Sequence, residues 1–597
     1  MDGIASCGHV RRGMGCVVRE IWARARRNIH ELHEKQRQGG VSASKKLLAA
    51  IAVLAVAFAV FAAIPAAVDD SDAAGETVYV DADYTGSSSD GTATNPYKTL
   101  KAALDDTNSN TVILKSNINA TEADANGIFT VSKAVTIKSA DSNDRKVLPF
   151  GIKTTFNLTL QDVTLSPAEN VKLLRVDGNV VVDIENCTIN VNGGTANARG
   201  DGIEIGSAAS VVIKNNTFNN VTSGHYVRAM FISNVSGNVD IDNNTATGFH
   251  VFAALHSVST TASKVTTVKD NKSYEMTGDF KVGSETKDSK FLQIAGTGSN
   301  VVVKNNIVTA KNADDKIPYV NAYDRGATVA SLTVDKDMTV NGTLTISGTV
   351  EVGGLITVKK FDDEQGTITI NDGKTLIVNG GLVGDEGATI TNNGGTLFNN
   401  STITMKKETN AYSGTGTFVA GAGSSAKMKI ASEVTDNKFI GTGTVEGVTP
   451  AKDATVCDYA ELVNYLNAGV PIVKLRGNIT VADDVFVKSG TLLDGMDFSL
   501  TLGTKKVTVN GAIKNIGFEN GAESWNVGVA VNDVVSGSFT ITADTSSATI
   551  VADKIGGKLT VLDATLSGKI SDDLEIVKKE SIFVEKHVSH RFGFGPR

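Results

Sequence analysis

Residues 86–106 read GSSSDGTATNPYKTLKAALDD, a glycine- and serine-rich stretch that turns into one short amphipathic helix. The helical portion, YKTLKAALDD (97–106), places Leu100, Ala103 and Leu104 on one face. The chain after this helix is rich in alternating Val, Ile and Thr, a pattern that predicts β-strands. A single helix ahead of a long series of strands therefore needs a structural role.

The strands repeat along the chain. Five segments share a β-branched residue followed shortly by a polar residue and Asn: IENCTIN (184–190), IKNNTFNN (213–220), IDNNTATG (241–248), VKDNKSYE (268–275) and VKNNIVTA (303–310). They start 29, 28, 27 and 35 residues apart, and a period of this length predicts a solenoid. Coils of short strands without regular helix indicate a parallel β-helix. We expect Asn after each strand to take the left-handed conformation of a corner, and stacked Asn side chains to hydrogen-bond between coils.

The helix explains how such a stack begins. The first coil of a solenoid exposes a sheet edge that must be covered, and the helix at 97–106 is predicted to cover it. The segment ETVYVDADYTGSSSDGTATNPYKTLKAALDD (76–106) resembles the start of right-handed parallel β-helix proteins of the pectate-lyase-like superfamily. The resemblance extends over residues 76–450. It implies an all-β, right-handed parallel β-helix solenoid with short amphipathic N-terminal capping helices.

A second helix-and-strand element lies further along the chain. Residues 458–495 parallel 97–139, because each begins with an amphipathic helix, continues into an apolar strand and then shows N-I-x-(A/V). We therefore predict two β-helices in tandem, a first at 78–450 and a second, smaller one at 451–575. An unpatterned tail, 576–597, follows them.

Two segments between these caps, 332–358 and 366–405, have a tighter rhythm punctuated by Gly and Asn. We interpret them as regular coils of the first solenoid. The alternative is a separate small β-rich module.

The N-terminal part of the chain predicts export. A basic segment, 1–46, precedes the apolar stretch 47–68, which is followed by an acidic linker, 69–77. As a helix the apolar stretch spans about 33 Å, enough to cross a bilayer, and serves as either a transmembrane signal anchor or a cleaved signal peptide. The charge bias places the N-terminus in the cytoplasm and the rest outside. We expect localisation at the cell surface or outside the cell, with anchoring by 47–68 if it is uncleaved.

Residues 1–40 differ in composition from the remainder, since seven arginines fall in the first 46 residues. Our hypothesis is that 1–40 are not translated and that translation starts at Val41. The alternative is a genuine basic cytoplasmic segment.

Charge and cysteine content exclude several classes of protein. The net charge is −8 overall, and the basic N-terminal segment leaves the remaining body strongly acidic, which disfavours nucleic-acid binding. The four cysteines, Cys7, Cys16, Cys187 and Cys457, show neither a disulfide framework nor zinc-ligand spacing.

The pectate-lyase-like superfamily includes lyases and hydrolases of acidic polysaccharides, so the resemblance raises the possibility of an active site. The nearest match is RGDGIEIGS (199–207) followed by SGHYVRAM (223–230). We expect Asp201, His225 and Arg228 on adjacent coils, with Glu204 or Arg175 close by. The pattern departs from the hydrolases, because GHY replaces Gly-His-Gly and both the Asp-Asp pair and Arg-x-Lys are missing. These residues are catalytic candidates, but no catalytic site is favoured.

No cofactor or metal site is predicted. His225 and His250 lie 25 residues apart, near one coil length, but lack carboxylate or thiolate partners. Asp-rich turns such as DADY (81–84), NADDK (312–316) and KFDDEQG (360–366) offer oxygen ligands for Ca²⁺, yet none has the spacing of a known calcium loop. We interpret them as solvated turns.

Asn-x-Ser/Thr triplets are abundant and are candidates for glycosylation in an exported protein. Further triplets start at Asn186, Asn215 and Asn399, and we expect the first two to be less available because they lie in coil-stacking ladders. The candidates are Asn119, Asn157, Asn220, Asn234, Asn243, Asn271, Asn341, Asn400 and Asn478.

The sequence favours a non-enzymatic, adhesin-like surface protein that contacts other cells, glycans, proteins or envelope polymer. This expectation follows from the resemblance to archaeal and bacterial adhesin-like β-helix proteins. The alternatives are a polysaccharide lyase or glycoside hydrolase acting through Asp201, His225 and Arg228, and a structural component of the envelope.

Overall fold

The computed structural model describes residues 76–578. Gaps fall at 168–172, 193–199, 222–225, 279, 283–284, 288, 316, 361–364, 407–410, 503–504, 506, 510–511, 515, 520–527, 532–536, 543–547, 556, 562–563 and 571–574. The predicted segments 1–46 and 47–68, and most of 69–77 and 576–597, lie outside the described residues. Among the helices that the structure describes, none is long and apolar enough to cross a bilayer.

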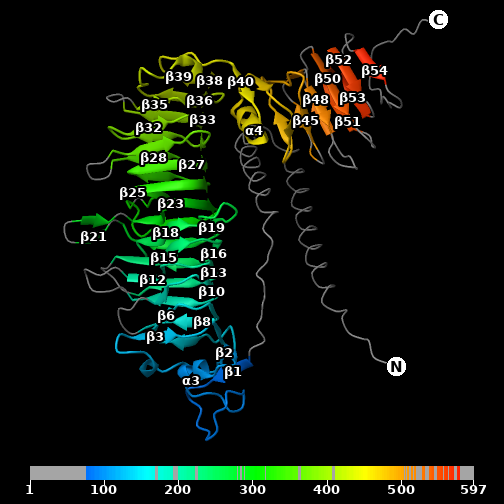
Figure 1. The fold of residues 1–597 in the computed structure, drawn as a ribbon. Coiled ribbons are helices and arrows are strands. Elements are labelled where there is room, and N and C mark those ends of the chain that lie inside the picture. Colours follow the sequence, from blue (N-terminus) through cyan, green and yellow to red (C-terminus); the bar gives the residue numbers. More distant parts are fainter. Residues whose placement is uncertain are drawn as a thin grey trace, which may run out of the picture. The chain divides into compact units, whose positions relative to one another are not determined.

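Parallel strands stacked coil upon coil make up the first part of the chain (Figure 1). This confirms the predicted all-β, parallel solenoid. Each early coil has three strands, and the strands of successive coils pair in register on three faces. Face 1 begins with β1 (Glu76–Val80), β2 (Ser109–Leu114), β4 (Val135–Ser139), β7 (Leu158–Gln161), β10 (Val181–Glu185), β13 (Ser210–Lys214), β16 (Val239–Asp242) and β19 (Thr266–Lys269).

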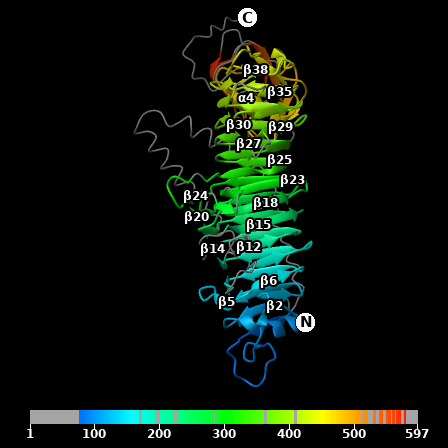
Figure 2. The same cartoon turned by 90° about the vertical axis from the view of Figure 1, so that its left-hand side faces the viewer.

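The other two faces follow the same order along the chain. Face 2 begins with β3 (Ile128–Val131), β6 (Gly151–Thr154), β9 (Leu174–Val176), β12 (Gly200–Ile205), β15 (Val227–Val235) and β18 (Val251–Val258). Face 3 contains β5 (Lys146–Leu148), β8 (Val163–Leu165), β11 (Thr188–Val191), β14 (Thr217–Asn220), β17 (Thr245–Thr247), β20 (Lys272–Met276) and β24 (Ile307–Ala310). Figure 2 shows β5, β14, β20 and β24 along one edge of the stack.

Alternation along each strand builds the core. In β10, Val182 and Ile184 are buried while Asp183 points outward, and the same parity holds in β13 and β16. In-register pairing places Ile184 beside Ile213, and Ile213 beside Ile241. Because each fully buried aliphatic side chain contributes about 1.5–3 kcal/mol, these inward columns hold the coils together.

The repeated Asn motif forms the corner between face 1 and face 3. The first residue after each strand adopts a left-handed conformation, as predicted, with φ of 57° at Asn215, 51° at Asn243 and 56° at Asn305. The residue after it points inward and stacks on its counterpart in the next coil. This inner ladder consists of Asn216, Asn244, Asn271 and Asn306, all buried.

The cross-section changes at the coil that contains β23 (Lys290–Lys304) and β24. Face 3 ends there, and the long strands β23 and β25 (Val320–Val334) run from face 2 into face 1 through a new middle segment. This middle segment starts a fourth face, which continues in the first half of β27 (Thr343–Val352) and in β29 (Thr367–Ile370), β32 (Thr389–Asn392) and β35 (Tyr412–Gly414).

The later coils continue the earlier ones without a break in pairing. Residues 332–358 and 366–405 are therefore coils of the first stack, as interpreted from the sequence. Face 1 continues with the second half of β27, then β30 (Thr375–Val378), β33 (Thr396–Asn399), β36 (Thr417–Ala420) and β38 (Phe439–Gly441). Face 2 continues with β26 (Met338–Asn341), β28 (Ile356–Lys359), β31 (Leu382–Gly384), β34 (Thr402–Met405), β37 (Ser425–Lys427) and β39 (Thr444–Val445). A short antiparallel hairpin, β21 (Phe280–Val282) and β22 (Glu285–Lys287), interrupts the series.

Both predicted capping helices are present. Helix α3 (Leu100–Asp105) buries Leu100, Ala103 and Leu104 and contacts β1 and β2. The Thr99 side chain caps it by accepting a hydrogen bond from the Ala102 N–H at 3.1 Å. Helix α4 (Tyr459–Ala468) has an equivalent place before the second set of coils, with Asp458 as its N-cap.

The second set of coils is also parallel. Its strands form three separate sheets. One contains β40 (Asp453–Val456), β41 (Ile472–Leu475), β44 (Leu492–Asp494) and β47 (Ala512–Lys514). Another contains β42 (Ile479–Thr480), β45 (Ser499–Thr501), β48 (Ile516–Glu519), β50 (Gly537–Thr542), β52 (Gly557–Val561) and β54 (Glu575–Lys578). The third contains β43 (Val485–Val487), β46 (Val507–Val509), β49 (Gly528–Val531), β51 (Ala548–Ile555) and β53 (Ala564–Ile570).

Helix α4 packs on the first stack as well as on its own coils. The ring centroids of Phe398 and Tyr465 lie 5.1 Å apart, edge to face, and the Ala422 N–H donates to the Ala468 carbonyl at 2.8 Å. Phe398 belongs to an outward column on face 1 that also contains Ile377 and Val419, and all three are buried. Outward apolar residues at this end of face 1 therefore mark where the helix docks, a contact that the sequence did not predict.

Candidate functional site

Two of the catalytic candidates meet in a buried ion pair. Asp201 in β12 and Arg228 in β15 occupy paired positions on adjacent coils, as predicted. The Arg228 Nε and Nη2 atoms donate to the two Asp201 carboxylate oxygens at 2.7 and 2.9 Å. The Asp201 and Arg228 side chains are 0% and 4% exposed, respectively. This bidentate ion pair balances both buried charges, and both carboxylate oxygens accept hydrogen bonds from the guanidinium group.

The remaining catalytic candidates do not extend this ion pair into a larger site. His225 lies outside the described residues. Glu204 pairs in register with Arg175 of β9, but the Arg175 Nε atom donates to Asp177 at 3.0 Å in a largely exposed ion pair. The structure thus places Asp201 and Arg228 together, and it places Glu204 and Arg175 on neighbouring strands.

An aromatic and amide cluster next to the ion pair was missed by sequence reasoning. The Arg228 guanidinium carbon lies 4.3 Å from the centroid of the Phe231 ring. That ring meets His256 edge to face with centroids 5.0 Å apart, and His256 Nε2 lies 2.9 Å from Gln293 Nε2. The signal for this cluster is pairing register, because Phe231 and Gln293 both pair with Ala254, and His256 lies two residues after Ala254 on the strand between them.

Asn321 lies on the same face, one coil beyond Gln293. Its side chain is fully buried, and neither its amide oxygen nor its amide nitrogen has a hydrogen-bond partner. An unpaired buried amide costs about 1–3 kcal/mol, so this position is a strained point of face 2.

His250 is buried and neutral. The Val227 N–H donates to its Nδ1 atom at 3.3 Å, and the Tyr226 ring lies beside it with centroids 5.3 Å apart. Burial lowers the pKa of His250 to about 4. Its environment is that of a core histidine.

In the described part of the chain, one group of side chains has the spacing of a metal site: Cys457, Asp458 and Glu461. These groups already bond to each other and to α4. Glu461 accepts hydrogen bonds from the Cys457 N–H at 3.0 Å and from its thiol at 3.4 Å, while Asp458 accepts from the Glu461 N–H. The negative charge of Glu461 raises the pKa of Cys457, which keeps the thiol protonated. The cluster therefore acts as the N-terminal cap of α4.

The Asp-rich turns make internal hydrogen bonds. The Asp83 N–H donates to the Asp81 carboxylate at 3.2 Å, and the Asn312 amide donates to Asp315 at 2.9 Å. These bonds are typical of solvated Asx turns. Part of KFDDEQG, 361–364, lies outside the described residues.

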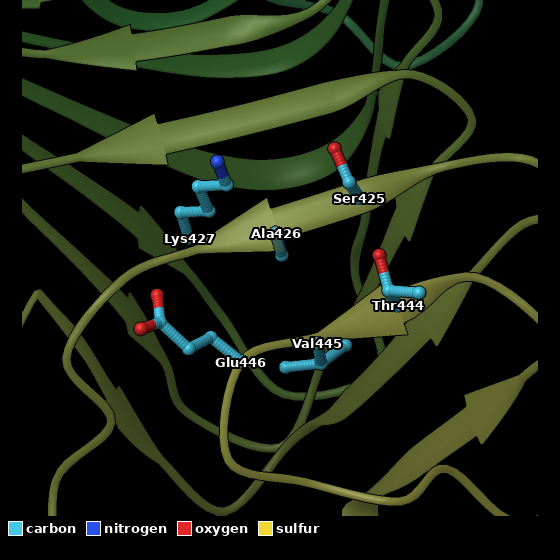
Figure 3. Close-up of a pocket in the computed structure, with 6 residues that line it drawn as sticks. All are labelled: Ser425, Ala426, Lys427, Thr444, Val445 and Glu446. Atoms are coloured by element: carbon cyan, nitrogen blue, oxygen red, sulfur yellow. The ribbon is translucent and has the colours of Figure 1, made fainter.

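A shallow, open pocket lies where face 2 ends (Figure 3). It is lined by Ser425, Ala426, Lys427, Thr444, Val445 and Glu446, from β37, β39 and the residue after β39. It exists because no further strand of face 2 follows β39 in the pairing order. The lining contains the Lys427 amine, the Glu446 carboxylate and the hydroxyls of Ser425 and Thr444. It lacks the second carboxyl group that acid–base cleavage of a glycoside needs.

The glycosylation candidates differ in accessibility. Asn119, Asn157, Asn234, Asn243 and Asn478 are exposed. Asn271 and Asn341 are buried, and the Asn271 amide donates to the Ile241 carbonyl and to Asn306 within the inner ladder. The Asn400 amide donates to Asn379 at 2.9 Å, and the Asn220 amide donates to the Gly248 carbonyl at 2.7 Å. Glycosylation stays a prediction, and a glycan at Asn271 would have to displace ladder bonds.

Comparison with known proteins gave no match: no protein-family model, no curated protein and no solved structure resembles this chain closely enough to be assigned.

Proposed function

We propose that this chain is a non-enzymatic, adhesin-like β-helix protein that is exported and contacts other cells, glycans or envelope polymer. We also propose that the chain is related to the pectate-lyase-like superfamily. Residues 47–68 anchor it in the membrane if that segment is uncleaved. The observation that carries it is the continuous ladder of paired coils from β1 to β39. A scaffold of this kind presents side chains at fixed spacing, so little conformational entropy is lost when a partner binds.

The Asp201–Arg228 ion pair argues against glycan cleavage by Asp201. Asp201 is the carboxylate of the main catalytic candidates, and Arg228 donates hydrogen bonds to both its oxygens. General acid–base cleavage of a glycoside needs two carboxyl groups at a set separation on either side of the bond. Among the described residues, the position that pairs with Asp201 on β15 is Arg228 and not a second carboxylate.

The test uses the full chain with acidic and neutral polysaccharides and with whole cells, in the presence and absence of calcium. Both bound protein and new reducing or unsaturated chain ends are measured. Saturable binding without new chain ends is the expected result. Turnover would overturn the proposal in favour of a lyase or hydrolase, and ordered arrays of the protein without any binding would indicate a structural envelope component.

A further inference from the structure

Two columns of hydroxyl side chains run up the fourth face. The first column contains Thr343, Thr367 and Thr389, and the second contains Thr328, Thr345, Thr369, Thr391 and Ser413. We call these positions the threonine strip. Strands β25, β27, β32 and β35 follow one another along the stack (Figure 1). Three consecutive coils therefore present Thr-x-Thr in register.

The strip faces outward. The residues between the two columns, Leu344, Ile368 and Ile390, are fully buried, so the flanking threonines point away from the core. Five parallel strands about 4.8 Å apart give a strip about 19 Å long, with columns about 6.6 Å apart. It is long and narrow.

The chemistry of the strip is uniform. Each threonine offers a hydroxyl that donates and accepts hydrogen bonds, together with a methyl group. Its branched side chain is stiff at χ1 and loses little freedom on binding. No charged residue occupies either column, whereas outward positions on face 1 include Asp183, Lys214 and Asp240. The strip thus differs from the charged outward positions of face 1 in these earlier coils.

The size, hydroxyl spacing and charge of the strip limit the class of partner that can bind it. A patch of about 130 Å² is far below the roughly 800 Å² per partner that a stable protein interface needs. An ice surface would require evenly spaced hydroxyls, but Thr367 Oγ1 and Thr389 Oγ1 lie 3.1 Å apart, closer than their strands. A flexible linear chain can adjust to uneven spacing. The absence of charge disfavours acidic polymers.

We propose that the threonine strip binds a linear, neutral polysaccharide that lies along the stack, across the strands. This inference rests on the proposed function and specifies its partner. The glycan hydroxyls bond to the threonine hydroxyls, and its C–H faces pack on the threonine methyls. Because the columns contain no aromatic ring, binding is weak, with a Kd of about 1 mM, and depends on several coils acting together.

The test is affinity electrophoresis of the full chain in native gels containing hydroxyethylcellulose, barley β-glucan or polygalacturonate. The protein is expected to be retarded by the two neutral glycans and not by polygalacturonate. The variant Thr345→Val, Thr369→Val, Thr391→Val removes three hydroxyls while keeping the branched shape, and is expected to weaken retardation about tenfold. The matched control is Thr349→Val, Thr375→Val, Thr396→Val, a neighbouring threonine column on face 1, which should bind like the parent.

Circular dichroism and thermal unfolding establish that both variants fold. If the strip variant is retarded as strongly as the parent, the strip is not the site, although the proposed function stands. Retardation by polygalacturonate alone overturns the neutral class of partner. Ice shaping by the parent that is lost in the strip variant, without glycan binding, assigns the strip to ordered water. If the protein binds neither glycans nor cells, the proposed function fails together with this inference.

Discussion

The side chain of Asn244 lies directly under that of Asn271 in the next coil. Asn271 Oδ1 accepts hydrogen bonds from both the backbone N–H and the side-chain Nδ2 of Asn244, each at 2.9 Å. The same Nδ2 atom also donates to the Ile213 carbonyl of the preceding coil at 2.8 Å. One buried amide thus satisfies backbone groups at a corner where the sheet ladders are interrupted.

Replacement of Asn244 by Ala should destabilise the protein by at least about 3 kcal/mol, because it leaves several buried partners unpaired at about 1–3 kcal/mol each. The measurement is the free energy of unfolding in urea. The matched control is Asn243→Gly at the exposed neighbouring position, which keeps the positive φ of 51° and should change stability by less than about 1 kcal/mol. Equal effects of the two changes would contradict a special role for the inner ladder.

The Asp201–Arg228 pair predicts strong coupling between the two residues. Asp201→Asn should cost about 3–5 kcal/mol, because it leaves the Arg228 charge buried without its partner. The double variant Asp201→Leu, Arg228→Met should recover most of that loss, since it buries apolar groups instead. A double-mutant cycle by urea unfolding measures the coupling, and additive single effects would rule out the pair as a unit.

Asp183 predicts a pH-dependent contribution to stability. Its outward side chain lies between Thr159 and Val212 on the neighbouring strands. Burial first, and then the charge of Glu185, raise the pKa of Asp183 from 3.8 to about 6, although Lys214 opposes the shift. The folded state therefore binds the proton more tightly than the unfolded state. The contribution is complete below pH 3.8 and is lost as the pH rises to about 6.

Asp183→Asn should remove this dependence and stabilise the protein at pH 7 by about 1 kcal/mol, a value reduced for solvent screening of a partly exposed group. Unfolding free energies of parent and variant from pH 3.5 to 7 give the comparison. A constant difference between them across that range would show that the Asp183 pKa is ordinary.

The contact between Phe398 and Tyr465 predicts that α4 is held on face 1 by aromatic packing. Phe398→Ala should lower stability by about 3 kcal/mol and speed proteolysis between β39 and β40, because the helix loses its anchor. Phe486→Ala is the control, since that ring is 38% exposed and its loss should cost little. Unchanged proteolysis in Phe398→Ala would show that the helix is held by other contacts.

The sequence alone determined the class of fold and the capping helix that precedes each of the two sets of coils. The period-two alternation, the Asn repeat and the faces of the two helices each depend on local chemistry: side-chain parity, left-handed corners and amphipathic spacing. Leu100, Ala103 and Leu104 pack as their spacing required. The repeated spacing even placed Asp201 and Arg228 on adjacent coils.

The tertiary structure decided which interactions the residues on adjacent coils make. The register between β12 and β15 turned two catalytic candidates into a closed ion pair, and register also aligned the threonines of three coils into one strip. Docking of α4 on Phe398 likewise depends on residues 67 positions apart in the chain (398 and 465). Such contacts are set by how coils of unequal length stack, which local patterns do not encode, because a side chain's partner lies a whole turn of the solenoid away.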